Sequence, residues 1–266
     1  MLIAIDVGNT HTVIGAFEGD RLLRTFRLTS HRNLTVDELS WWMEGLMRRS
    51  GLDPDAVRGM AVSSVVPPLT GVFEEYARRN KTPLMVVGPD TDTGIQVRYE
   101  PPGDVGADRV VNAVAAHHRC PDRDVIVVDF GTATTFDAVT ARGEYLGGVI
   151  VPGVTVSLDA LFARTARLPR VEVHRPPRVV GRNTVHSIQS GAYFGYLAMV
   201  EGLVTRMRRE MAEPVRVLAT GGLATLLCGD SPLIDEVLPD LTLEGLRIVW
   251  DRNRPGMDTV PPHPAP

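Results

Sequence analysis

The chain has 266 residues, of which 44% are hydrophobic and 23% charged, and its formal net charge is -4. This length suits two domains better than one core, and the composition excludes a disordered or fibrous protein. A mildly acidic chain has no long-range attraction for nucleic acid or for an anionic membrane, so we expect a small-molecule partner instead.

The cysteines and the apolar runs indicate a cytoplasmic protein. Cys120 and Cys228 lie far apart and outside any C-x-x-C spacing, which is typical of reduced thiols rather than of disulfides or zinc ligands. The N-terminus enters a strand pattern without a basic, signal-like segment, and Gln189 and Glu201 interrupt the apolar run 188–204. We therefore expect no signal peptide and no membrane span.

The first half of the chain predicts a strand meander followed by alternating helices and strands. Thr35 and Glu38 have capping-box spacing before a helix that Gly51 ends, and Trp41 and Trp42 are expected to pack from that helix into the core. The other elements expected here are strands at 12–17, 21–28, 59–65 and 84–87, a helix at 68–79, and a surface loop at 89–103.

The second half repeats this opening pattern. The expected elements are a helix at 107–118, a strand, turn and strand from 125, a strand at 145–151, a helical run at 186–211, a strand at 215–219 and a last helix ending near 243–250. Within the helical run, Gly191 and Gly195 fall on one face, which favours close packing inside the fold or across a dimer interface.

Two acidic turns, one in each half, are the main chemical signal. Asp6 with Gly8, Asn9 and Thr10 corresponds to Asp129 with Gly131, Thr132 and Ala133. In each turn, backbone N–H groups and hydroxyls are suited to binding phosphate while the aspartate faces a cation. Each aspartate alone is typical of an ordinary turn, but the repetition predicts a duplicated, two-lobed protein that binds a polyphosphate with a metal between its lobes.

Two common nucleotide motifs are absent, namely G-x-x-x-x-G-K-[ST] and G-x-G-x-x-G. Transfer of a phosphoryl group to an alcohol also needs a base. Asp108, in Gly106-Ala107-Asp108-Arg109, is the leading candidate, beside an arginine suited to an anionic group. From spacing alone, interaction of this first-turn aspartate with the helix dipole is better supported than a role as base, so both roles stay open.

Taken together and in this order, five segments resemble the bacterial type III pantothenate kinases over about residues 2–253. The segments are Asp6–Thr10, Gly106–Arg109, Asp129–Asp137, Gly147-Gly148 to Pro152-Gly153, and Thr220-Gly221-Gly222. Each motif is modest alone, whereas the ordered set is specific. One departure is Pro101-Pro102-Gly103, just before the second segment, which would shift Tyr99.

The resemblance implies an α/β architecture, the duplicated ribonuclease H-like (actin-like ATPase) fold. It implies two lobes, at 1–118 and 119–254, with mixed five-stranded sheets flanked by helices; the proline-rich tail 255–266 is expected to be disordered. The implied reaction is ATP-dependent phosphorylation of pantothenate to 4′-phosphopantothenate, the first step of coenzyme A biosynthesis. It also implies Mg²⁺, a monovalent cation (K⁺ or NH₄⁺), and a homodimer whose partner subunit completes the pantothenate pocket.

The family's functional residues map onto this sequence position by position. Asp108 matches the proton acceptor, and Asp129 matches the ligand of the monovalent cation. ATP-binding positions are Asp6, Val7, Gly8, Asn9, Thr10, His11, Thr12, Val13 and Thr132. Pantothenate-binding positions are Tyr99, Gly106, Ala107, Asp108, Arg109 and Thr184.

Two other functions remain open from sequence. One is a nucleotide-binding regulatory protein, a transcription accessory factor that keeps the fold without catalysis; the retention of Asp108 and Asp129 argues against it. The other is a kinase of the same superfamily that phosphorylates a different small alcohol.

Overall fold

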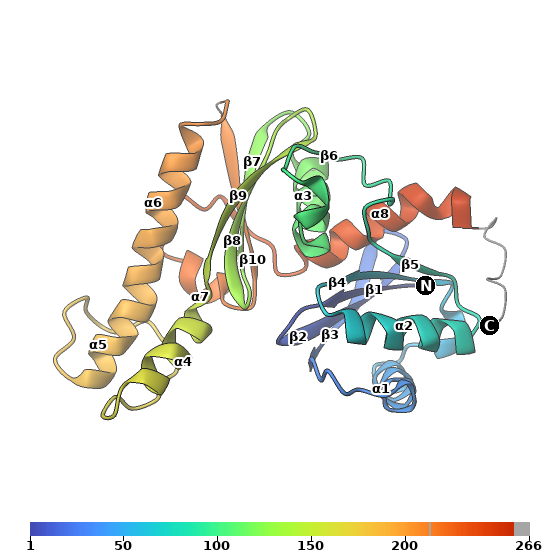
Figure 1. Cartoon of the computed structure of the whole chain (residues 1–266), viewed down its shortest axis with the longest axis horizontal. Helices are drawn as coiled ribbons and strands as arrows, with labels where there is room; N and C mark the ends of the chain where they lie inside the picture. The colour runs from blue at the N-terminus through green and yellow to red at the C-terminus, as the bar shows by residue number, and fades with distance from the viewer. Residues whose placement is uncertain (213, 258–266) are drawn as a thin grey trace. The chain divides into compact units, whose positions relative to one another are not determined.

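In the computed structural model of the chain, residues 1–212 and 214–257 are described. The chain folds into two compact units, each described here by itself (Figure 1). The first unit comprises Met1–Ile95, Glu100–Ala115 and the chain from Thr242, and the second comprises Gln96–Tyr99 and Ala116–Leu241.

The first unit is a mixed sheet covered by helices on both faces. Its elements are β1 (Leu2–Val7), β2 (His11–Glu18), β3 (Arg21–Thr29), α1 (Val36–Arg49), β4 (Gly59–Ser64), α2 (Pro67–Arg79), β5 (Leu84–Val86), most of α3 (Ala107–Arg119) and α8 (Leu241–Met257). A 3₁₀ turn, Pro54–Ala56, precedes β4. Within the described residues the strand order is β3-β2-β1-β4-β5, with β1 antiparallel to β2 and parallel to β4.

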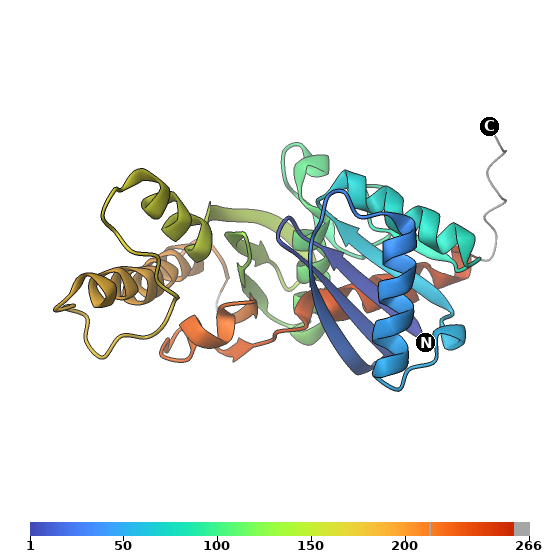
Figure 2. The same ribbon diagram turned by 90° about the horizontal axis from the view of Figure 1, so that it is seen from below.

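Strand alternation decides which helices cover which face of this sheet. Ile3 and Ile5 of β1 pack with Leu39 of α1 and Phe73 of α2, and the views of Figures 1 and 2 place these two helices together on one face. The intervening Ala4 belongs to a second cluster with residues of α3 and α8. The last helix of the sequence therefore lies in the first unit.

The second unit repeats this arrangement. Its elements are β6 (Gln96–Val97), β7 (Asp124–Phe130), β8 (Ala133–Val139), β9 (Glu144–Pro152), α4 (Val154–Arg164), α5 (Thr184–Ser190), a π-helical turn (Gly191–Gly195), α6 (Tyr196–Arg208), β10 (Val215–Gly221), α7 (Ala224–Cys228) and β11 (Glu236–Val237). The strand order among the described residues is β11-β10-β7-β8-β9-β6. Strands β9-β8-β7-β10-β11 thus match β3-β2-β1-β4-β5, which confirms the predicted duplication.

The sixth strand is a difference from the expected five-stranded sheet. β6 lies in the segment 89–103, which we expected to be a loop, and it pairs in parallel with β9. The amide of Gln96 donates to the carbonyl of Gly143 (2.8 Å), and Arg98 forms an ion pair with Glu144 (2.8 Å). These partners lie about fifty residues away, so the local sequence pattern does not reveal the strand. The same segment ends in a 3₁₀ turn, Pro102–Asp104.

Two expectations about helices need correction. Trp41 does not pack into the core, because the buried stripe of α1 is Leu39, Met43 and Met47 and the Trp41 side chain is 75% exposed. Trp42 is half-buried against His31, with ring centroids 6.2 Å apart. The helical run expected at 186–211 is interrupted by the π-helical turn Gly191–Gly195.

Other expectations are confirmed. The capping box of Thr35 and Glu38 is present, and Gly51 follows α1 with a φ of 74°. Among the helices that the structure describes, none combines the length and the apolar character needed to cross a bilayer. Of the expected tail, Pro255–Met257 continue α8, and residues 258–266 lie outside the described part of the chain.

Candidate active site

The first acidic turn joins β1 to β2 at the carboxyl end of β1. The Gly8 amide donates to the His11 carbonyl (3.0 Å), and a Cβ on Gly8 would lie 3.0 Å from that oxygen. Asn9 and Thr10 at the tip are exposed, and Asp6 just before it is half-buried. The turn therefore presents backbone and side-chain donors to solvent next to a carboxylate.

Ser30, directly after β3, fixes this turn from the side. Its hydroxyl donates to the Gly8 carbonyl (2.6 Å) and lies 2.9 Å from the Thr12 hydroxyl, while its amide donates to the Thr10 carbonyl (2.9 Å). With both carbonyls engaged, the backbone of the turn is fixed in place. Sequence reasoning missed Ser30, because it comes from a different strand and no local spacing marks it.

His11, at the start of β2, is neutral near pH 7. Partial burial lowers the pKa of His11, and the positive charge of Arg27 lowers it further. The ring therefore does not add a positive charge to the turn, whereas Arg32, whose guanidinium donates to Asn9 Oδ1 (3.4 Å), brings one to its tip.

The segment Gly106–Arg109 begins α3 within the same unit. The Arg109 amide donates to Asp108 Oδ1 (2.9 Å), and a Cβ on Gly106 would lie 2.5 Å from the same oxygen. Glycine is therefore needed at 106 for the carboxylate to occupy this position. The Cβ position of Gly106 is also 3.7 Å from Val65 Cγ1, and the Val65 amide donates to the Val7 carbonyl (3.1 Å). The Gly106–Arg109 segment and the first acidic turn thus lie at the same end of the first sheet.

Burial raises the pKa of the Asp108 carboxyl, and this effect outweighs the opposing hydrogen bond from the Arg109 amide and the charge of Arg109. A carboxylate that serves only the helix dipole at a solvated end is not expected to be desolvated in this way. A raised pKa makes a carboxylate a stronger base, and general bases work best when their pKa approaches the working pH. The geometry therefore favours the base role that spacing alone left open.

Arg109 is 8% exposed, so its guanidinium is held in place rather than solvated. On the same helix Asn112 is fully buried and its Oδ1 accepts a hydrogen bond from the Thr242 hydroxyl (2.8 Å), which ties α3 to α8. A fixed arginine at a helix start is suited to binding a carboxylate in two parallel hydrogen bonds.

The second acidic turn joins β7 to β8 in the second unit. The Gly131 amide donates to the Ala133 carbonyl, and the Gly153 amide donates to the Thr132 carbonyl, both at 3.0 Å. A Cβ on Gly153 would lie 2.4 Å from the Thr132 carbonyl oxygen, so the start of α4 packs directly against the turn. Thr132 itself is exposed.

The two turns differ in length, which corrects the expected position-by-position correspondence. Val7 pairs with Thr12 across the first turn, whereas Phe130 pairs with Thr134 across the second. The second turn is therefore one residue shorter, and Ala133 already belongs to β8 while Thr10 lies in a turn.

Asp129 is half-buried at the carboxyl end of β7, beside Gly221 of β10. A Cβ on Gly221 would lie 2.5 Å from Asp129 Oδ1, so the carboxylate packs directly against the backbone of this glycine. Residues 1–212 and 214–257 contain no group of three or more His, Cys, Asp or Glu side chains arranged to hold a metal. A single accessible carboxylate fits a cation that takes its other ligands from carbonyls, water and phosphate.

Tyr99 and Thr184 lie elsewhere in the second unit. The Tyr99 ring is 3.2 Å from the Cβ position of Gly147, which has a φ of 112°, and its centroid is 6.4 Å from that of Tyr145. Thr184 is exposed at the start of α5 and lines a hollow of about 750 Å³. This hollow lies between α4 and α5, and its lining includes neither Asp129 nor Thr132.

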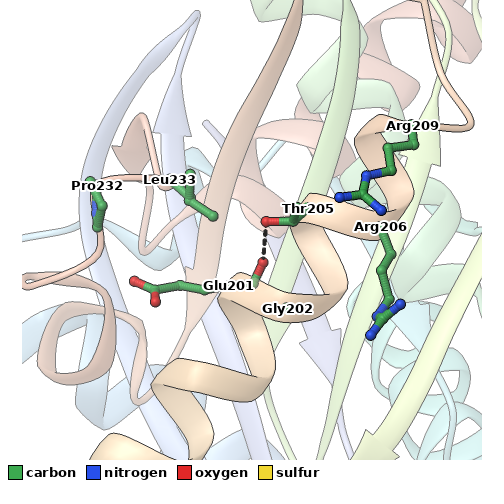
Figure 3. A pocket seen from close by; sticks show the side chains of 7 residues that line it. All are labelled: Glu201, Gly202, Thr205, Arg206, Arg209, Pro232 and Leu233. Carbon is green, nitrogen blue, oxygen red and sulfur yellow. Dashed lines mark hydrogen bonds between the residues drawn. The ribbon is translucent and has the colours of Figure 1, made fainter.

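A second hollow, of about 460 Å³, lies along α6 and coincides with none of the predicted site residues. Figure 3 shows Arg206 and Arg209 on one side and Glu201 on the other, with the Thr205 hydroxyl donating to the Glu201 carbonyl (2.7 Å). Arg206 and Arg209 are exposed.

Two solved structures share the architecture. A putative Baf family transcriptional activator from Campylobacter jejuni matches with a TM-score of 0.57 and 16% identity, covering 95% of this chain and 99% of that one. The activator of 2-hydroxyisocaproyl-CoA dehydratase from Clostridium difficile matches with a TM-score of 0.51 and 11% identity, covering 99% of both chains. Identities this low show the fold alone, and with the two mixed sheets they confirm the duplicated ribonuclease H-like fold. The class of protein is thus defined by its fold, a duplicated ribonuclease H-like fold with an acidic glycine turn in each unit.

Sequence relatives narrow this class to one family. The family model for type III pantothenate kinase matches residues 2–206. A type III pantothenate kinase of Myxococcus xanthus (strain DK1622) is 52% identical over 254 residues, covering 95% of this chain and 99% of that protein. One of Anaeromyxobacter sp. (strain Fw109-5) is 52% identical over 257 residues, covering 96% and 100%. The chain belongs to the type III pantothenate kinase family.

Proposed function

We propose that this chain transfers the γ-phosphoryl group of ATP to the primary hydroxyl of pantothenate, giving 4′-phosphopantothenate for coenzyme A biosynthesis. The observation that carries the proposal is Asp108, a desolvated carboxylate with a raised pKa in the Gly106–Arg109 motif of a chain that belongs to this family. The C. difficile activator named above was solved with bound ADPNP, which supports a nucleotide site in this fold.

Asp108 is assigned as the base that accepts the proton of the pantothenate hydroxyl while its oxygen attacks the γ-phosphorus. Arg109 holds the pantothenate carboxylate, and Gly106 and Ala107 allow the substrate to approach the start of α3. Tyr99 and Thr184 are assigned further contacts with pantothenate. The substrate is thereby oriented, so that removal of one proton at a fixed oxygen accompanies phosphoryl transfer.

Residues Asp6–Val13 are assigned to the ATP phosphates. The exposed tip at Asn9 and Thr10 and the hydrogen bonds by which Ser30 fixes this turn support this role. Thr132 is assigned a contact with ATP from the second turn. Mg²⁺, when bound, neutralises charge on the transferring phosphoryl group, and Asp6 is the carboxylate of the first turn suited to it.

Asp129 is assigned as the ligand of a monovalent cation, K⁺ or NH₄⁺. The glycine at 221, which allows the Asp129 carboxylate to keep its position at the end of β7, supports this assignment. A monovalent cation here supplies positive charge near the phosphates, and Asp129 holds it there. The neighbouring Thr132 and the start of α4 keep the turn in place.

We also assign a homodimer whose partner subunit completes the pantothenate pocket. Gly191 and Gly195 support this, because in the described part of the chain no heavy atom lies within 4 Å of a Cβ built at either position. Val179 and Val180, in the segment before α5, are 63% and 78% exposed. Apolar and small residues left uncovered in one chain are typical of an interface.

A coupled assay tests the function directly. Purified protein with Mg²⁺ and ATP should form ADP when pantothenate and K⁺ are both present, and mass spectrometry should find 4′-phosphopantothenate. ADP formation with another small alcohol but not with pantothenate would overturn the substrate assignment. Nucleotide binding without any transfer would favour the regulatory alternative, which family membership does not favour.

A further inference from the structure

Two adjacent serines at the end of β4 differ sharply in their contacts. The Ser64 hydroxyl accepts from the Val66 amide (3.2 Å) and from the Thr70 hydroxyl (2.8 Å). The Ser63 side chain is fully buried, and its hydroxyl has no hydrogen-bond partner among the residues that the structure describes. An unmade hydrogen bond in a buried hydroxyl costs free energy, so native structures seldom keep one without a use.

Ser63 lies within the proposed site rather than in the apolar interior. It is the register partner of Asp6 in the parallel pair of β4 and β1, so the two side chains project from the same face of the sheet. Two residues earlier on this face, Ala61 belongs to the cluster beneath α3. Val65, just after the end of β4, has its Cγ1 3.7 Å from the position that a Cβ on Gly106 would take. Ser63 therefore lies beside the first acidic turn and two residues before the residue that approaches the Gly106–Arg109 segment, all in one unit.

The second unit repeats the same relationship. Thr220 of β10 is the register partner of Asp129 in β7, and it is 1% exposed. Each half of the chain thus places a buried hydroxyl on the strand beside its acidic turn, opposite the aspartate. Packing alone does not explain a hydroxyl at both places, because the buried residues two positions earlier on the same face, Ala61 and Leu218, are apolar.

We infer that Ser63 is a positioning residue for Asp6. In the nucleotide-bound state its hydroxyl donates a hydrogen bond to the Asp6 carboxylate and holds it toward the cation and the phosphates; Thr220 does the same for Asp129. This inference rests on the proposed function for the role of Asp6. Orientation of a cation-binding carboxylate by a second hydrogen bond is a general way to strengthen such sites.

The inference predicts an unusual combination of effects for Ser63→Ala in the full chain. Without ligand, the variant should melt at the same temperature as the wild type or higher, because an unsatisfied hydroxyl has been removed. By calorimetry it should bind a non-hydrolysable ATP analogue with Mg²⁺ about tenfold more weakly, the order expected for loss of a hydrogen bond to a charged group. Ser64→Ala is the matched control, which should melt lower without ligand and bind the analogue within about twofold of the wild type.

Thr220 supplies a second comparison. Thr220→Val keeps the shape and removes the hydroxyl, whereas Thr220→Ser keeps the hydroxyl and loses a methyl group. If the hydroxyl positions Asp129, the K⁺ concentration for half-maximal analogue binding should rise several-fold in the valine variant and stay near wild type in the serine variant. Equal behaviour of the two variants would assign Thr220 to packing.

The results separate this inference from the proposed function. A Ser63→Ala variant that melts lower without ligand and binds the analogue like the wild type would overturn the positioning role, as would one that matches the wild type in both measurements. Wild-type protein that binds the analogue but fails to phosphorylate pantothenate would overturn the function while leaving the Ser63 comparison valid. Wild-type protein that does not bind the analogue at all would overturn both.

Discussion

Gly221 and Asp129 are so close that a Cβ on Gly221 would lie 2.5 Å from the carboxylate oxygen Oδ1 of Asp129 and 2.6 Å from the Phe130 amide nitrogen. Gly221 also has a φ of 93°, a conformation that residues with a side chain rarely adopt. Glycine is thus required at this position for two reasons: the backbone has a positive φ, and the Asp129 carboxylate occupies the place of a side chain.

Gly221→Ala should therefore weaken K⁺ activation and destabilise the fold. The strained backbone is expected to cost about 1–3 kcal/mol, and displacement of the carboxylate should raise the K⁺ concentration needed for half-maximal activity. Denaturant unfolding and a K⁺ titration measure the two effects. Gly202→Ala is the control, because a Cβ at this position of α6 meets no atom of the described chain within 4 Å and alanine favours a helix. A Gly221→Ala enzyme with wild-type K⁺ dependence would contradict the role given to Gly221 in placing the Asp129 carboxylate.

Asp108→Asn should lower kcat by about 10²–10⁴-fold, the usual contribution of a general base. Because burial raises the pKa of Asp108, kcat of the wild type should fall with decreasing pH from a point above the ordinary range of aspartate. The variant should lose this acidic limb. A pH profile of both enzymes tests this, and an unchanged profile would remove Asp108 from the proton-transfer step.

The same substitution should stabilise the protein at neutral pH. The folded protein keeps a proton on Asp108 at pH values where the unfolded chain has already released it, since the folded pKa is the higher one. The free energy of unfolding therefore decreases as pH rises from the ordinary aspartate pKa through the raised value. It stays at this lower level at higher pH. Asparagine does not ionise, so the variant should melt above the wild type at pH 8. The difference should vanish below the ordinary pKa of aspartate.

Features that depend on neighbouring residues could be predicted from the sequence. The turn at Gly8, the helix begun by Thr35 and the glycine at 131 are each decided within a few positions. The duplication followed from recognising that Asp6 and Asp129 open equivalent units. Local patterns and one internal repeat were thus enough for the two-lobed organisation, whereas the fold class was implied by the resemblance to a known family.

Features that depend on distant partners could not be predicted. β6 forms because Gln96 meets Gly143, and the first turn is held by Ser30 from another strand. The burial of Asp108, which favours its role as a base, depends on how α3 packs. The prediction for Trp41 was wrong because a tryptophan in an amphipathic helix is usually buried. In α1, however, the buried residues lie on another side of the helix.

Arg109→Lys should affect pantothenate more than ATP. Lysine keeps the positive charge but not the planar pair of donors that binds a carboxylate in two parallel hydrogen bonds. We expect the KM for pantothenate to rise roughly tenfold, with the KM for ATP little changed. Steady-state kinetics with each substrate varied in turn measures this. A rise in the KM for ATP alone would move Arg109 from the pantothenate site to the nucleotide site.

Cys228 should resist alkylation in the folded protein. Burial raises the pKa of its thiol to about 12, so hardly any reactive thiolate is present at pH 8. Cys120 is only half-buried. Iodoacetamide followed by peptide mass spectrometry should label Cys120 in native protein and both cysteines in denaturant. Activity should survive the labelling, because neither thiol has a part in the proposed reaction.

The homodimer is tested by Gly191→Leu. In the described part of a single chain, no atom outside the glycine's own helix lies within 4 Å of a Cβ at this position, so leucine should fit the monomer. At protein concentrations where both proteins are dissociated, the variant should therefore melt close to the wild type. Across an interface formed by the π-helical turn, the larger side chain should separate the subunits. Light scattering should then report the monomer mass, and the KM for pantothenate should rise more than the KM for ATP, because the partner subunit is proposed to complete the pantothenate pocket.

Gly45→Leu on α1 is the matched control, a helical glycine with equally open surroundings in the first unit, and it should remain dimeric. A Gly191→Leu dimer with wild-type kinetics would place the interface on another surface.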